Sequence, residues 1–130
     1  MKHKKLIIAI ITITLLCFAI NYAIYWYNDL KDRLASITIE DIDLTTIEDG
    51  TYAGSYKFFL NYVEVAVTIK DHSITKIDLI EHQQGRGKKA EAIIEEVINQ
   101  QTLQVDTIAG VTSSSKTILK AIENALKISK

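Results

Sequence analysis

The dominant feature of the hydrophobic pattern is one apolar run at residues 6–27, in which no residue is charged. These 22 residues would form a helix about 33 Å long, enough for a bilayer core of about 30 Å. Basic residues precede the run and aromatic residues close it: Lys2, Lys4 and Lys5, then Tyr22, Tyr25, Trp26 and Tyr27. Basic flanks stay cytoplasmic and aromatic side chains settle at the headgroups, so the pattern predicts a single-pass anchor. Residues 1–5 would be a cytoplasmic tail, and residues 28–130 would be extracytoplasmic.

Two other interpretations of this run are weaker. A cleaved signal peptide would have a shorter apolar region, and no small-x-small cleavage site follows the run. A lipoprotein signal would use Cys17, but Leu16 stands where a small residue normally precedes the lipidated cysteine. We therefore expect an uncleaved anchor. Cys17 is the only cysteine, so the portion outside the membrane must be stable without disulfides.

Alternating apolar and polar residues further along the chain predict antiparallel strands. Residues 63–70 alternate strictly, which is typical of a strand with one buried face. A second apolar set at residues 74–80 follows Asp71 and His72, which would form the tight turn of a hairpin. Residues 51–60 would supply a third strand before them.

Two later segments have helical periodicity instead. Residues 88–100 carry apolar side chains at i, i+3, i+4, i+7 and i+8, and the pattern returns at residues 118–126. Strands followed by helices predict an α+β domain: a small antiparallel sheet with helices packed on one face. One N-terminal transmembrane helix would precede it.

Residues 49–130 are long enough for one small domain, and residues 28–48 lie between this domain and the anchor. Apolar residues are interspersed with acidic ones over 28–48, which is too apolar for a flexible linker. We interpret 28–48 as a juxtamembrane stalk that packs on the domain. Residues 28–130 hold 12 basic and 16 acidic residues, a net charge of −4. This balance argues against binding of nucleic acid and against a polybasic lipid-binding patch.

The strongest chemical signal is the stretch from Asp106 to Ser115, in which a glycine turn precedes four consecutive hydroxyl residues. One hydroxyl would suffice to cap a helix. Four hydroxyls beside Gly110 favour a phosphate site instead, because backbone amides at a helix N-terminus attract anions and glycine permits close approach. The simpler interpretation, that Thr112 only caps the last helix, stays open.

A second glycine pair, Gly85 and Gly87, joins the second hairpin strand to the first helix. The pair has no third glycine for a dinucleotide fingerprint and no G-K-[ST] sequence for a P-loop. It is either a flexible connector or a loop that lets a planar ligand lie against the backbone.

Taken in order, these segments resemble the small FMN-binding domains of extracytoplasmic electron-transfer proteins. These include the flavin subunits of sodium-pumping quinone reductases and of related membrane electron-transfer complexes. The resemblance covers residues 49–127 and rests on four pieces: the D-G-T-Y-A-G opening at 49–54, the hairpin at 67–77, the E-H-Q-Q-G-R-G loop at 81–87, and the D-T-I-A-G-V-T motif at 106–112. The ordered combination is specific, although no single piece is.

The resemblance implies that Thr112 carries FMN through a phosphoester bond, made by a flavin transferase that uses FAD and a metal ion. The cofactor-binding residues it implies are Thr112, Asp106, Gly110, Val111, Ser113, Ser114, Gly85, Gly87 and Tyr52. Tyr52, Tyr56 and Phe58 would form an aromatic bed for the isoalloxazine ring, or serve only as sheet-face core residues. His82 would lie near the flavin edge, or be a solvated loop residue.

Three residues depart from the family pattern. Ala109 stands where the family has serine or threonine, Val111 where it has alanine, and Gln84 where short members often have histidine. Two alternatives therefore stay open beside covalent attachment. One is a noncovalent FMN carrier, and the other is a non-redox docking or assembly module on the same fold.

The function that the resemblance implies is a membrane-anchored extracytoplasmic flavoprotein that transfers electrons. Expected partners are the flavin transferase, membrane lipid around the anchor, and a membrane reductase or quinol as electron donor. No residue resembles a general base, a triad nucleophile or a metal cluster. An electron-transfer flavoprotein is therefore favoured over a self-sufficient enzyme.

Overall fold

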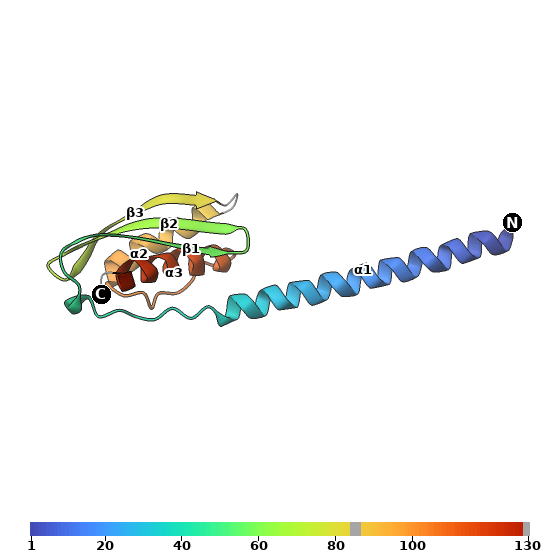
Figure 1. Ribbon diagram of the computed structural model, residues 1–130, viewed down its shortest axis with the longest axis horizontal. Helices are drawn as coiled ribbons and strands as arrows, with labels where there is room; N and C mark the ends of the chain where they lie inside the picture. The colour runs from blue at the N-terminus through green and yellow to red at the C-terminus, as the bar shows by residue number, and fades with distance from the viewer. Residues whose placement is uncertain (84–86, 129–130) are drawn as a thin grey trace. The chain divides into compact units, whose positions relative to one another are not determined.

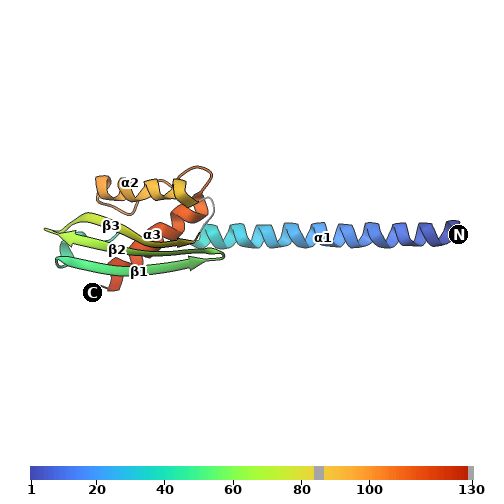
Figure 2. The same cartoon turned by 90° about the horizontal axis from the view of Figure 1, so that it is seen from above.

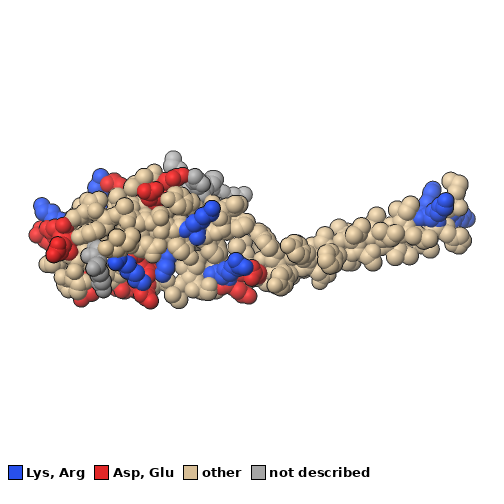
Figure 3. Space-filling model, in the orientation of Figure 1, with Lys and Arg blue, Asp and Glu red and all other residues tan. Residues whose placement is uncertain are grey.

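The computed structural model describes residues 1–83 and 87–128, which form parts of two compact units, Met1–Ile37 and Thr38–Lys130. The first unit is one helix, α1, at Lys2–Ser36 (Figure 1). It contains the whole predicted span and continues beyond it, and none of its residues is buried. In Figure 3 basic side chains mark its N-terminal end, and a surface without charged side chains follows. By length and composition α1 could cross a membrane.

Three polar side chains within the apolar run of α1 are bonded to the helix itself. Thr12 donates to the carbonyl of Ala9 at 2.8 Å, Thr14 donates to Ile10 at 2.9 Å, and Asn21 donates to Cys17 at 2.8 Å. In lipid a polar group without a hydrogen-bond partner costs on the order of several kcal/mol. These internal bonds remove that cost, so the three polar residues are compatible with a membrane span.

The second unit contains a three-stranded antiparallel sheet in the order β1-β2-β3, as the sequence predicted. β1 is Gly50–Phe58, β2 is Asn61–Lys70 and β3 is Ser73–Gln83. The odd-numbered residues of β2 from 61 to 69 are buried and the even-numbered ones are not, which is the alternation read from the sequence. The buried side chains form one face of the sheet, where the core lies.

The turn between β2 and β3 is the predicted one at Asp71 and His72. Lys70 pairs with Ser73, and both turn residues have positive φ, 51° and 59°. A two-residue loop with positive φ at both positions matches the twist of a hairpin. Asp49 supports this turn, because its carboxylate accepts a 2.9 Å hydrogen bond from the Asp71 amide. Asp49 opens the motif at 49–54, and its contact is a structural one.

Two helices, α2 at Ala92–Gln100 and α3 at Thr112–Ile128, cover one face of the sheet (Figures 1 and 2). The predicted helix at 88–100 is therefore divided: a 3₁₀ segment, η2, occupies Gly87–Glu91 before α2 begins. α3 packs on β1 and β2, with ten of its residues buried. The fold is the predicted α+β domain with helices on one face.

α3 approaches the sheet closely at Gly54, which is buried in β1. A Cβ atom at this position would overlap the carbonyl oxygen of Ala121 and the backbone of Ala125. Only a glycine leaves room for the helix backbone here. Small residues on both surfaces therefore set how near α3 lies to β1.

The segment before β1 packs on the domain through hydrogen bonds to the chain beyond α2. Asp41 accepts bonds from the Thr102 hydroxyl at 2.9 Å and the Leu103 amide at 3.0 Å. Gln104 donates to the carbonyl of Ile39 at 2.7 Å. A short 3₁₀ turn, η1, follows at Leu44–Thr46, and Ile47 is buried in the core. These contacts fix the beginning of the loop that leads to α3.

A buried carboxylate, Glu123, ties the same segment to α3. Its side chain is fully buried and accepts hydrogen bonds from Lys120 at 2.8 Å and from the Glu40 amide at 3.3 Å, and it pairs with Lys127. Burial alone would raise the pKa of Glu123, but the bonds from Lys120, Lys127 and Glu40 outweigh burial and lower it. Lys120 also donates to the carbonyl of Thr38 at 3.0 Å.

We predict that Gly54→Ala destabilises the domain by roughly 1–3 kcal/mol or more, because the new methyl group overlaps the backbone of α3. Gly50→Ala is the matched control in the same strand. The nearest atoms to a Cβ there belong to the Tyr52 side chain, at 3.4 Å or more, and we expect little change. Urea unfolding of both variants measures the difference. Equal stabilities would contradict the close contact.

A second prediction concerns acid. Because the folded pKa of Glu123 lies below its ordinary value of 4.5, its contribution to stability is complete above that value and is lost as pH falls through the folded pKa. Glu123→Gln should lower the free energy of unfolding by roughly 1–3 kcal/mol near neutral pH. The deficit should shrink in acid, while exposed Glu48→Gln shows neither effect. A deficit independent of pH would contradict the role of the charge.

Candidate functional site

The motif at 106–112 forms a loop, a tight turn and the first turn of α3. The Val111 amide donates to the carbonyl of Ile108 at 3.1 Å, and Gly110, the third residue of this turn, has a φ of +82°. These are the features of a type II turn, which places glycine at that position. Apart from the two chain neighbours of Gly110, no atom of the described residues lies within 4 Å of where its Cβ would stand. Gly110 is thus required by its backbone conformation, and it leaves open space beside the turn.

The buried side chain of Ser115 holds this turn against the helix. Its hydroxyl accepts a hydrogen bond from the Ile108 amide at 3.1 Å and donates to the carbonyl of Val111 at 3.0 Å. The Ser115 amide also bonds to Val111, at 2.9 Å, which is the first hydrogen bond of α3. Ser115 therefore fixes the turn and the helix start as one unit.

Thr112 is the first residue of α3, and it is exposed. The amides of Thr112, Ser113 and Ser114 precede the first helical hydrogen bond, so they lie in the part of a helix that attracts anions. An exposed hydroxyl beside these amides can accept a phosphoryl group and leave its oxygens near the positive end of the helix.

Asn61 fixes the helix start to the sheet. Its buried side chain donates a 2.7 Å hydrogen bond to the hydroxyl of Ser113. Asn61 is the first residue of β2 and pairs with Phe58, the last residue of β1. Thr112 therefore lies at the end of the sheet where the β1–β2 turn is, and Phe59 and Leu60 of that turn are exposed.

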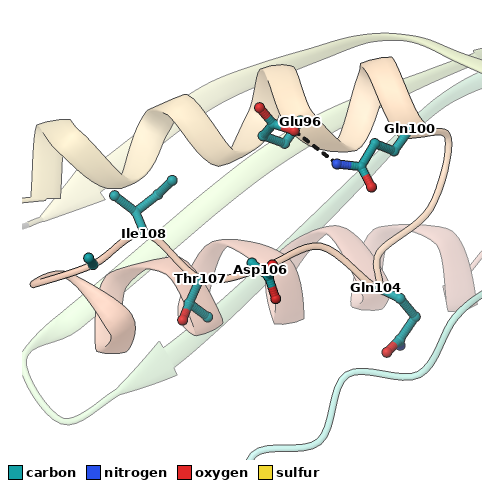
Figure 4. A pocket seen from close by; sticks show the side chains of 7 residues that line it. Glu96, Gln100, Gln104, Asp106, Thr107 and Ile108 are labelled. Atoms are coloured by element: carbon teal, nitrogen blue, oxygen red, sulfur yellow. Dashed lines mark hydrogen bonds between the residues drawn. The ribbon is translucent and has the colours of Figure 1, made fainter.

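A groove of about 380 Å³ runs between α2 and the loop before the turn (Figure 4). Glu96 and Gln100 line it from α2, where Gln100 donates to Glu96 at 2.9 Å. From the loop it is lined by Gln104, Asp106, Thr107, Ile108 and Ala109. The groove is mostly polar and follows the motif up to the turn that precedes Thr112.

The structure brings together most of the residues predicted for the cofactor site. Gly110, Val111, Thr112, Ser113 and Ser114 are consecutive at the start of α3. Asp106 lies on the groove a few residues before them, and it is exposed. Val111 is half-buried and packs against the core, and Ser114 is buried.

The remaining predicted residues are placed differently. Gly85 lies outside the described residues, and Gly87 begins η2, which packs against α3. Tyr52 pairs with Val67 near the opposite end of β1 from Phe58, and its hydroxyl donates to the carbonyl of Glu48 at 2.8 Å. The structure does not bring Tyr52 to Thr112. Two other aromatic residues of the strand, Tyr56 and Phe58, lie nearer to the helix start.

His82 lies in β3 and is not a solvated loop residue, because its side chain is only 5% exposed. Its Nδ1 is 3.4 Å from a carboxylate oxygen of Glu91 in η2. Its Nε2 is buried and has no hydrogen-bond partner among the residues that the structure describes. A buried polar atom without a partner costs about 1–3 kcal/mol, so a native structure needs a reason to keep one.

Sequence reasoning missed two residues that build the site. Ser115 belongs to the hydroxyl run, but nothing in the sequence separates the hydroxyl that bonds the turn from those that face solvent. Asn61 carried no signal at all, because its partner, Ser113, is 52 residues away in the chain.

One comparison with known proteins identifies a family. Residues 61–127 match the model of the FMN-binding domain family. The match contains the hairpin, α2, the groove and α3 up to Lys127. No curated protein matches the chain.

We predict that Ser115→Ala destabilises the domain by roughly 1–3 kcal/mol, because it leaves the Ile108 amide without its partner. Thr107→Ala, in the same loop but with no comparable bond described for its side chain, should change stability little. Chemical denaturation compares the two variants. Equal losses would contradict the role assigned to Ser115.

Proposed function

We propose that this chain, which belongs to the FMN-binding domain family and uses FMN as its cofactor, is a membrane-anchored flavoprotein that carries FMN covalently on Thr112 and transfers electrons. The observation that carries the proposal is the exposed hydroxyl of Thr112, placed as the first residue of α3 directly after the Gly110 turn. FMN supplies one- and two-electron chemistry, while the protein supplies position and electrostatics.

The residues around Thr112 fit a phosphoryl group on its hydroxyl. The first amides of α3 offer hydrogen-bond donors and a positive partial charge. The open space beside Gly110 leaves room for the phosphate and for an approaching enzyme. The side chain of Asn61, bonded to Ser113, holds the helix start in place.

The two departures from the family motif are compatible with covalent attachment. The side chain of Val111 packs against the core, so its extra methyl groups are directed inward and need not crowd Thr112. Ala109 is exposed and lines the groove, so the missing hydroxyl removes a surface contact and no internal bond. The chain therefore keeps the acceptor and its support.

Attachment requires a separate flavin transferase. The Thr112 oxygen would attack the phosphorus of the FMN half of FAD and form a new phosphoester bond. The hydroxyl proton would pass to solvent, and AMP would leave with the electron pair of the broken bond. A bound metal ion in the transferase would neutralise the phosphates. We expect the transferase to bind the groove beside the motif, because the groove follows the residues that lead to Thr112.

As a membrane anchor, α1 would hold this chemistry at a membrane. The lysines at the N-terminal end of α1 and the aromatic residues further along it favour a cytoplasmic N-terminus and an extracytoplasmic domain. An electron donor within reach would be a membrane reductase or a quinol. The net charge of −4 over residues 28–130 gives no support to nucleic acid as a partner.

The test is the intact mass of the full chain coexpressed with a flavin transferase. We expect an added mass of FMN less one water, which Thr112→Ala abolishes. Thr75→Ala, at an exposed threonine of β3 outside the motif, should keep the adduct. Yellow protein without the added mass would instead support noncovalent binding.

Colourless protein without the added mass, from cells in which the transferase modifies another substrate, would contradict the proposal. That result would favour the docking or assembly module.

A further inference from the structure

We propose that His82 is a cofactor contact: its buried Nε2 forms a hydrogen bond with the isoalloxazine ring of FMN attached at Thr112. The inference rests on the proposed function for the position of FMN. It adds a ring-binding residue from β3, on a segment of the chain remote from the motif at 106–112.

The first support is the unpartnered nitrogen. The side chain of His82 is 5% exposed, and Nε2 finds no partner among the described residues. Buried side-chain polar atoms in folded proteins nearly always have a hydrogen-bond partner, so an unpaired one points to a ligand that binds there. A leucine would fill the same space without this cost.

The second support is the orientation of the His82 imidazole ring. The carboxylate of Glu91 faces Nδ1 at 3.4 Å, and a carboxylate accepts a hydrogen bond from an N–H. The proton of a neutral His82 therefore belongs on Nδ1, which leaves Nε2 as an acceptor. The side chain of Glu91 is 39% exposed, so it reaches solvent while His82 does not.

The chemistry of the ring matches this nitrogen. Oxidised isoalloxazine has one N–H, at N3, flanked by two carbonyl oxygens. A neutral His82 would accept from N3–H, and a protonated His82 would donate to a neighbouring carbonyl. Both protonation states of His82 therefore select the same edge of the isoalloxazine ring, the one that carries N3.

The third support is location. His82 pairs with Val63, on the buried face of β2 and two residues from Asn61. Asn61 bonds Ser113, the neighbour of Thr112, and η2, which carries Glu91, packs against α3. His82 and Thr112 therefore lie at the same end of the domain. The ribityl chain separates the ring of FMN from its phosphate, so the ring must rest on a surface other than Thr112 itself.

The chain has three histidines, so ¹⁵N-histidine NMR of the full chain in detergent can follow His82 directly. We would compare protein made with and without the transferase, after intact mass has shown the adduct in the first sample. The Nε2 resonance of His82 should move upfield on loading, as expected for an acceptor that gains a hydrogen bond. His3 and His72 are exposed and should not move.

Thermal unfolding of His82→Leu supplies a second readout. The variant should match or exceed the wild type in flavin-free form, because the unpaired nitrogen is gone. The gain in Tm on FMN loading should fall by roughly 4–8 °C for a domain of this size. His82→Gln, which keeps polar atoms, should recover part of the gain, and His72→Asn should keep all of it.

An unmoved His82 resonance in protein that carries the adduct would overturn this inference and leave the proposed function intact. An equal loss of Tm in the flavin-free and loaded forms of His82→Leu would show a structural role only. That result would also overturn the inference and leave the proposed function intact. Absence of the adduct would overturn both proposals.

Discussion

The contact between α3 and β1 at Gly54 is the constraint on which the rest of the domain depends. Gly54 has no side chain, so the backbone of α3 lies directly against β1 at this point. The buried residues of α3 therefore pack closely on the sheet. The position of its first residue, Thr112, follows from this packing. Asn61 then bonds the helix start to the end of β2. An acceptor hydroxyl on a rigid element is held more precisely than one on a loop.

The candidate site combines an exposed hydroxyl residue with a buried support. Thr112 faces solvent, whereas Ser115 is buried and bonds the turn, and Val111 packs inward. This division explains why a run of four hydroxyl residues can serve two purposes. Under the proposed function the hydroxyl of Thr112 carries the cofactor, whereas the hydroxyl of Ser115 supplies hydrogen bonds to the turn. His82, in β3, has a buried Nε2 without a hydrogen-bond partner among the described residues.

The sequence predicted the elements better than it predicted their contacts. Alternation identified β2 correctly, and the positive φ of Asp71 and His72 confirmed the turn. Local patterns suffice there because the period and the turn are local properties. Long-range partners are not local, so the pairing of Asn61 with Ser113 carried no signal. The expected aromatic bed shows the same limit, because strand periodicity puts Tyr52 on the helix-facing side but does not say at which end of the sheet α3 begins.

The most direct test of the account is the location of FMN on the chain. Peptide mapping with fragmentation of the segment between Lys89 and Lys116, from protein coexpressed with a flavin transferase, would assign the added mass to one residue. The account predicts that Thr112 carries the added mass. Thr107 and the three serines that follow Thr112 should be unmodified. Modification of a different residue, or an unmodified segment while the transferase acts on another substrate, would contradict the central claim.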